Sequence, residues 1–368
     1  MQASHLGAES SAAQRVVYLD NLRILLIVLV VLHHLGETYT DVSEWYYEEP
    51  PSGPVSSIVL VFLMAVNQSF FMGMFFLIAG HFAPPSLARH GVPAFVRDRV
   101  TRLGVPLALY FFVINGLVTR IGGQQAGWPL SPGPMWFAEV LLLLTLAYVV
   151  VHRTFPVVGS PRIDIATTTA LALTIGAGSF LIRTQIPVGV WLQFPTIQPA
   201  HATQYVCLFA VGIWAAGSDL GERITPGLAR YWRGMMLGVT TFIVTAFFWT
   251  GAAAGGQGDL DPFMGGWTWQ SFATSLWEQI FGVGMIVNLL RTVRERWNAA
   301  GPMLSSAAAS TYTVYVFHPI VVVLLARTLH PLDIPSLAKV AIAWPIAVVL
   351  LFMSAPYLRR TPLLRQVL

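Results

Sequence analysis

Charged side chains are scarce in this sequence. They make up 10% of its 368 residues, whereas a soluble domain carries about 25%. Hydrophobic residues make up 55%. So little charge cannot cover a folded surface that faces water on every side, which excludes an ordinary soluble protein. The composition predicts an integral membrane protein that crosses the bilayer several times.

Cysteine, lysine and several catalytic motifs are almost or wholly missing. Cys207 is the only cysteine, which excludes an internal disulfide framework and a cysteine-based metal site. Lys339 is the only lysine and there is no basic tail, so we expect no nucleic-acid partner. Neither a Gly-x-x-x-x-Gly-Lys-Ser/Thr loop nor a His-Glu-x-x-His helix is present, so nothing indicates ATP hydrolysis or zinc proteolysis. We expect no metal and no cleaved signal peptide.

Ten apolar runs are long enough to cross the bilayer, because a helix needs about 20 residues to do so. Backbone polar groups must be satisfied internally in lipid, so these runs predict an all-α polytopic fold. The runs cover approximately residues 20–38, 56–82, 101–121, 135–152, 165–184, 202–218, 232–252, 270–292, 303–328 and 336–357.

The basic residues of the loops predict the orientation of these spans. With the N-terminus inside, sixteen arginines fall in inside loops and tails, and only Arg120, Arg183, Arg327 and Lys339 lie near outside ends. This bias follows the positive-inside rule and predicts that both termini are cytoplasmic in a multi-pass protein of the cell membrane. We expect a cytoplasmic N-terminal tail (1–17), one membrane domain (18–358) and a cytoplasmic C-terminal tail (359–368).

The first apolar run carries ionisable residues, which are costly in a bilayer and therefore candidate functional residues. Eleven steps of about 100° bring His34 to within roughly 20° of Arg23, about 16.5 Å further along the same helix face. Glu37 continues this face by one turn, whereas His33 points about 100° away. His34 is therefore a candidate general base, with Glu37 as the carboxylate that orients it. The alternative is that His33 and His34 only form hydrogen bonds between helices.

Arg97, Arg99 and Arg102 cluster at the predicted cytoplasmic end of the third span. Guanidinium groups suit phosphates, so the cluster is a candidate phosphate-binding site. Simple positive-inside anchoring is the alternative.

Further polar and aromatic residues in the spans are candidate substrate-binding residues. Tyr315 and His318 are one turn apart, and Pro319 is expected to bend their helix and free a backbone carbonyl near His318. Gly73 and Gly80 are expected at close helix contacts. The other candidates, near outer ends of spans, are Ser69, Trp136 and Glu139.

Five segments together resemble the membrane acyltransferase-3 family. "LDNLRILLIVLVVLHHLG" is similar to its first helix, in which a basic residue precedes a histidine by eleven positions, here Arg23 and His34. "MFFLIAGHF" resembles its Phe-Phe-x-x-Ser-Gly segment, with Ala79 where serine is common. "RDRVTRLGVP" resembles its Arg-x-x-Arg motif at Arg99 and Arg102. "GPMWFAEVLL" and "STYTVYVFHPIVV" resemble its later segments, and all five follow the family order.

The resemblance, in particular to glucan-succinylating and other stand-alone members, implies O-acyl transfer. The donor would be cytoplasmic acetyl-CoA or succinyl-CoA, and the acceptor a hydroxyl of a glycan or small molecule. It implies His34 as catalytic histidine, Arg23 as its motif partner, and Arg99 with Arg102 as acyl-CoA residues. Because Arg23 and His34 lie far apart along the helix, we expect Arg23 to act at the cytoplasmic entrance.

Two other functions remain open at this point. A proton-coupled transporter or exporter of a glycan or lipid would also explain the buried ionisable residues. A sensory or scaffolding protein in the membrane would need no chemistry at all.

Overall fold

The fold was analysed in a computed structural model that describes residues 17–40, 45–124, 127–154, 161–250, 260–361, 364 and 367. The predicted N-terminal tail therefore lies almost wholly outside the described residues, as does half of the predicted C-terminal tail. The elements up to the middle of the chain are α1 (Val17–Glu37), α2 (Pro54–Gln68), α3 (Phe71–Arg99), η1 (Val100–Gly104), α4 (Val105–Leu109), η2 (Tyr110–Ile114), α5 (Asn115–Ile121), η3 (Gly133–Met135), α6 (Trp136–Val151) and α7 (Ile165–Arg183). The remaining elements are β1 (Leu192–Gln193), β2 (Thr196–Ile197), α8 (Pro199–Trp214), α9 (Pro226–Trp249), α10 (Asp261–Met264), α11 (Trp269–Arg296), α12 (Pro302–Leu329) and α13 (Ser336–Leu358).

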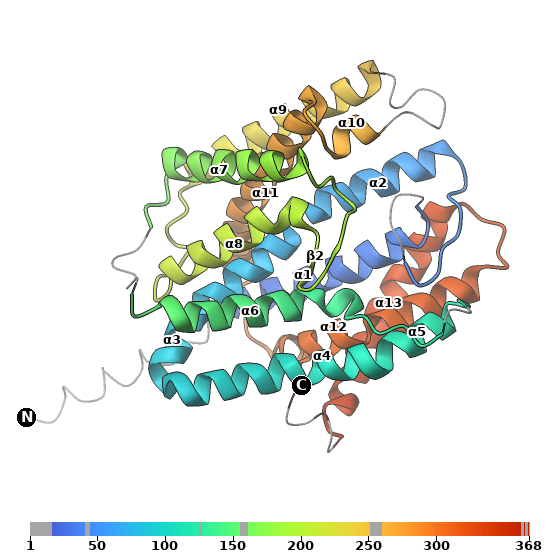
Figure 1. Cartoon of the computed structure of the whole chain (residues 1–368), viewed down its shortest axis with the longest axis horizontal. Coiled ribbons are helices and arrows are strands. Elements are labelled where there is room, and N and C mark those ends of the chain that lie inside the picture. The colour runs from blue at the N-terminus through green and yellow to red at the C-terminus, as the bar shows by residue number, and fades with distance from the viewer. Residues whose placement is uncertain are drawn as a thin grey trace, which may run out of the picture.

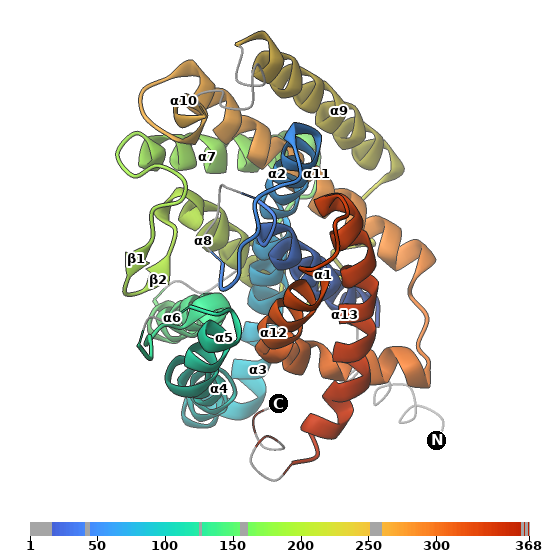
Figure 2. The same cartoon turned by 90° about the vertical axis from the view of Figure 1, so that its right-hand side faces the viewer.

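Helix α1 lies in the middle of the bundle (Figures 1 and 2), where it packs against α2, α3, α11, α12 and α13. In both views α7, α9 and α10 lie at one edge of the bundle, and α4 to α6 lie at the opposite edge. The short antiparallel hairpin β1–β2 lies beside α6. The central position of α1 agrees with its sequence, because a helix that is apolar on nearly every side is stable only when surrounded by other apolar groups.

Each of the ten predicted runs falls on helix in the structure. Within the described chain, seven helical stretches are long and apolar enough to cross a membrane. One of them is the 68-residue stretch Pro54–Ile121. That stretch contains two of the predicted runs. The first of these, 56–82, is divided between α2 and α3 by a break at Ser69 and Phe70. The structure therefore agrees with a polytopic all-α protein.

The chain reverses within α3. Gly91 has φ 72° and ψ 165°, so two helical segments meet there at a sharp kink. Glycine is favoured at this position because side-chain-bearing residues rarely adopt positive φ, and Pro93 can begin the second segment because its fixed φ suits a first helical turn. The kink turns the segment that carries Arg99 and Arg102 back towards the bundle.

Two glycines allow α3 and α8 to approach closely. A Cβ atom on Gly80 would lie 2.2 Å from the carbonyl oxygen of Phe209, and one on Gly73 would lie 2.5 Å from a methyl group of Leu208. At Gly80 any larger residue would force the helices apart, whereas at Gly73 it would displace the ends of the Leu208 and Gln204 side chains. Both glycines were expected at close helix contacts, and the structure confirms this.

Candidate active site

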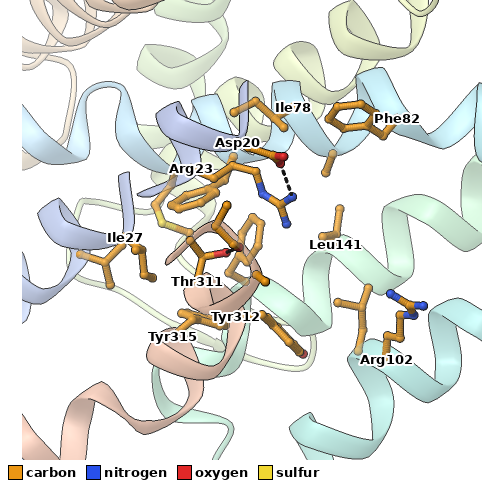
Figure 3. A pocket seen from close by; sticks show the side chains of 18 of the residues that line it. Asp20, Arg23, Ile27, Ile78, Phe82, Arg102, Leu141, Thr311, Tyr312 and Tyr315 are labelled. Atoms are coloured by element: carbon orange, nitrogen blue, oxygen red, sulfur yellow. Dashed lines mark hydrogen bonds and ion pairs between the residues drawn. The ribbon is translucent and has the colours of Figure 1, made fainter. Parts of the chain in front are cut away.

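A cavity of about 630 Å³ runs beside α1 (Figure 3). On α1 the lining residues recur about once per helical turn, and the last of them is Val30. Ile27 and Arg102 lie at opposite sides of the view, with the paired Asp20 and Arg23 between them. The lining residues are Asp20, Arg23, Ile27, Val30, Met72, Phe75, Ile78, Ala79, Phe82, Arg99, Arg102, Leu103, Phe137, Leu141, Ala308, Ala309, Thr311, Tyr312, Tyr315, Arg359 and Val367.

Four arginines line the end of the cavity that the sequence places on the cytoplasmic side, and we call them the mouth arginines: Arg23, Arg99, Arg102 and Arg359. They come from α1, the end of α3, the following helical turn and the end of α13. Three of them were predicted as site residues, whereas Arg359 had been assigned only to the cytoplasmic tail. No sequence motif marks Arg359, because only the fold brings the end of α13 to this cavity.

The mouth arginines have different surroundings. Arg23 lies 3.7 Å from Asp20 and its side chain is 42% exposed. Arg102 forms an ion pair of 2.7 Å with Asp98, and its side chain is 67% exposed. Arg99 is half-buried, contacts the hydroxyl of Ser86 at 3.4 Å, and lies over the ring of Phe95.

Helix geometry explains why Arg99 and Arg102 differ although they are three residues apart. The backbone from Val100 to Gly104 is a π-helical turn. Its i→i+5 hydrogen bonds turn the chain by a smaller angle per residue than an α-helix does. Arg102 therefore stands at a different angle to Arg99 than in an α-helix, and it pairs with Asp98, although both arginines line the cavity. Arg97 is exposed and is not among the lining residues.

The other end of the cavity lies one helical turn before His34. The His34 Nδ1 atom is 2.5 Å from Glu37 Oε2, and His33 Nε2 is 3.7 Å from the other oxygen of the same carboxylate. A carboxylate only accepts hydrogen bonds, so the proton of a neutral His34 ring is held on Nδ1 and the lone pair is on Nε2. The predicted pairing of His34 with Glu37 is present, and His33 packs against the ring of Phe71 at 5.0 Å.

Two aromatic rings stack against the His34 imidazole. The ring of Trp45 is stacked on it, with centroids 4.3 Å apart and an interplanar angle of 14°. The ring of His318 lies 4.9 Å away at 25°. Only 15% of the His34 side chain is exposed. These contacts fix the plane of the imidazole, while Glu37 fixes its rotation within that plane.

The orientation of His318 follows from the proline that succeeds it. A proline has no N–H, so Pro319 leaves the carbonyl of Tyr315, four residues earlier, without its helical hydrogen bond. His318 Nδ1 donates a hydrogen bond to that carbonyl at 2.7 Å, and the freed carbonyl itself was expected from the sequence. His318 Nε2 is buried and has no hydrogen-bond partner among the described residues. Tyr315 itself lines the cavity and donates its hydroxyl to the carbonyl of Pro134.

The segment after α1 holds Trp45 over His34. The Tyr46 hydroxyl donates to Asn115 and lies 3.0 Å from the hydroxyl of Tyr110. Burial raises the pKa of Tyr46 well above its usual range, so this phenol stays a neutral donor. Further along the segment, Glu49 forms an ion pair of 2.7 Å with Lys339. The segment is therefore fixed at both ends of its contact with the bundle.

Ser69, Trp136 and Glu139 are not among the residues that line the cavity. The buried hydroxyl of Ser69 donates to the carbonyl of Val66 at 2.7 Å. Glu139 accepts from the backbone N–H of Thr196 at 3.2 Å, so it holds the β1–β2 hairpin. Trp136 contacts other aromatic rings edge to face. These contacts hold helices and the hairpin together, and the substrate-binding role predicted for the three residues stays a prediction.

A second buried polar group is formed by Arg183, His201 and Glu278. Glu278 accepts from the Arg183 guanidinium and lies 2.8 Å from His201 Nδ1, and all three side chains are buried. No sequence motif marks Glu278, because its partners lie 95 and 77 positions away. Arg183, which the loop pattern counted only as an outer-end arginine, neutralises this carboxylate inside the bundle.

A buried histidine–carboxylate pair at the end of a cavity with a cationic mouth, inside a bundle of apolar helices, is the arrangement of a polytopic membrane enzyme. The chain matches the family model of the acyltransferase domain, acyltransferase-3 type, over residues 16–357. It therefore belongs to the acyltransferase-3 family and is a multi-pass membrane acyltransferase. No curated protein and no solved structure matches the chain. Family membership gives no support to the transporter alternative.

Proposed function

We propose that the protein is an O-acyltransferase of the cell membrane that uses cytoplasmic acetyl-CoA or succinyl-CoA. The acceptor is a hydroxyl group of a glycan or of a small molecule. His34 is the general base, Glu37 orients it, and the mouth arginines receive the phosphate groups of the donor. No metal takes part in this proposal.

The observation that carries the proposal is the position of the His34–Glu37 pair relative to the cavity. The mouth arginines lie at one end of the cavity, and Val30, one turn before His34, lies at the other. A donor held by its phosphates at the mouth would extend its thioester arm along α1 towards His34. Arg23 lies about 16.5 Å from His34 along the helix, so it supports donor binding and does not touch the reacting atoms.

The reaction needs a base that takes the proton of the acceptor hydroxyl and later passes it to the leaving thiolate. The acceptor oxygen attacks the thioester carbon while His34 Nε2 takes the hydroxyl proton, because an alcohol is otherwise a weak nucleophile at neutral pH. The imidazolium that forms is stabilised by Glu37. The tetrahedral intermediate then expels the thiolate of coenzyme A, which recovers the proton from His34, and the new ester bond is complete.

Neighbouring residues support this role of His34. His318 Nε2 has a free lone pair beside the His34 ring, so it is suited to accept a hydrogen bond from the acceptor hydroxyl. Trp45, from the segment after α1, stacks on the His34 ring. Aromatic rings also stack on sugar rings, which is consistent with a glycan acceptor.

The test begins with the acceptor. Acylated glycans and small metabolites are compared between cells with and without the gene, and the acceptor found is supplied to purified protein with acetyl-CoA or succinyl-CoA. His34→Ala should lower kcat by about 10²–10⁴-fold, the usual contribution of a general base. His33→Asn is the matched control and should retain activity. Full transferase activity of a correctly inserted His34→Ala protein would refute the proposal.

A further inference from the structure

We propose that Arg359, together with Arg99, forms the principal phosphate-binding pair of the cavity mouth, and that Arg102 has a secondary part. This inference rests on the proposed use of acyl-CoA, because it names the residues that hold the phosphates of that donor. It brings in the end of α13, which none of the matched sequence motifs includes.

Arg359 and Arg99 are distinguished by unsatisfied hydrogen-bond donors. Both side chains are half-buried and line the cavity, and both Nε atoms are buried without a hydrogen-bond partner among the described residues. A buried N–H that has lost water and gained no acceptor destabilises the protein, and more so when the group is charged. A ligand with several anionic oxygens would remove that cost at both positions.

The charges at the mouth point to the same pair. Within the described part of the chain, Asp98 pairs with Arg102 at 2.7 Å and Asp20 lies 3.7 Å from Arg23. Neither Arg99 nor Arg359 has a carboxylate within ion-pair distance among the same residues. Among the described residues, the mouth therefore holds two guanidinium groups that form no ion pair with a carboxylate. Arg102 is partly neutralised and mostly exposed, so a ligand gains less from it.

Guanidinium groups suit phosphates because their planar fork donates two parallel hydrogen bonds. Arg99 stands at the end of α3 and Arg359 directly after α13, so two helices far apart in the sequence hold the same ligand. A polyphosphate such as the diphosphate and 3′-phosphate part of coenzyme A offers enough anionic oxygens for both.

The experiment measures binding of coenzyme A to the purified full-length protein in detergent by isothermal titration calorimetry. Arg359→Gln and Arg99→Gln should each weaken binding by about tenfold or more, as expected for the loss of a charge-assisted hydrogen bond. Arg102→Gln should have a smaller effect. Arg360→Gln is the matched control, because Arg360 is the exposed neighbour of Arg359 and does not line the cavity. Melting temperatures confirm that each variant is folded.

Inorganic pyrophosphate is titrated in parallel to separate this inference from the proposed donor. If the wild-type protein binds coenzyme A and Arg359→Gln binds it equally well, the inference is wrong while the proposed function stands. If the wild-type protein binds pyrophosphate in an Arg359-dependent way but not coenzyme A, the phosphate pair is supported and the proposed donor is wrong. If it binds neither, both are wrong.

Discussion

Replacing Glu37 by glutamine is the sharpest test of the proposed chemistry. The Nδ1–Oε2 distance of 2.5 Å allows a glutamine at this position to keep a hydrogen bond to the His34 ring while losing the negative charge. The neutral resting imidazole is therefore little affected. The imidazolium that forms during attack loses its counter-charge, and the effect should fall on kcat.

The size of this effect can be worked out from the geometry. The charges of a carboxylate and an imidazolium are delocalised, so their centres lie about 4 Å apart at this contact distance, and at an effective dielectric constant of about 20 the attraction is worth about 4 kcal/mol. Each 1.36 kcal/mol changes a rate tenfold, so Glu37→Gln should lower kcat by about 10³-fold. The affinity for coenzyme A should not change, because Glu37 lies outside the cavity lining.

The assay follows release of the coenzyme A thiol by purified protein at saturating donor and acceptor, with coenzyme A binding measured separately. His33→Asn is the control, since the His33 ring lies 3.7 Å from the same carboxylate but outside the direct pair. A folded Glu37→Gln enzyme with kcat within tenfold of the wild type would refute the reasoning. An equally large loss in His33→Asn would show that the carboxylate acts through both rings.

Three further predictions concern stability, read as melting temperature in detergent. Glu278→Gln leaves the buried Arg183 without its counter-charge and should destabilise the fold by about 3–5 kcal/mol, and adding Arg183→Gln should recover part of this loss; no change in the single variant would contradict the role of the buried ion pair. Gly282→Ala places a Cβ atom 2.0 Å from a backbone carbonyl and should lower the melting temperature by the equivalent of about 1–3 kcal/mol, whereas Gly234→Ala, with nothing within 4 Å, should be tolerated. Partial burial alone would raise the pKa of Asp219, but hydrogen bonds and a nearby guanidinium lower it overall. Its folded pKa thus lies below the unfolded value of about 3.9, so it stabilises the fold above about pH 4 and ceases to do so as the pH falls further. The Asp219→Asn variant should therefore melt several degrees below the wild type at pH 7, and this difference in melting temperature should vanish in acid. If the difference were unchanged at low pH, the charge of Asp219 would not be its cause.

Much of the fold could be predicted because a membrane helix is a local feature of the sequence. Twenty apolar residues with few charges leave the backbone little alternative in lipid, so every predicted run is helical. The helical phase of α1 was also readable, because Arg23 and His34 repeat on one face of a single helix. For the same reason Pro319 predicted a freed carbonyl beside His318.

Features that depend on contacts between distant segments could not be predicted. Arg359 reaches the cavity only because α13 ends there. Trp45 covers His34 although an aromatic residue in an outer loop is equally suited to the membrane interface. The different surroundings of Arg99 and Arg102 depend on a π-helical turn, which no spacing rule in the sequence indicates.

The proline after His318 has one more consequence. The Tyr315 carbonyl that Pro319 leaves open can only accept a hydrogen bond. It therefore holds the proton of a neutral His318 ring on Nδ1, just as Glu37 does for His34. Two stacked imidazoles thus carry the same tautomer, one imposed by the main chain and the other by a side chain. In the neutral state both Nε2 atoms present lone pairs. At Nε2 the two rings can accept a proton from an incoming group, but neither can donate one before a proton has been taken up. The reaction therefore begins with proton transfer to the protein.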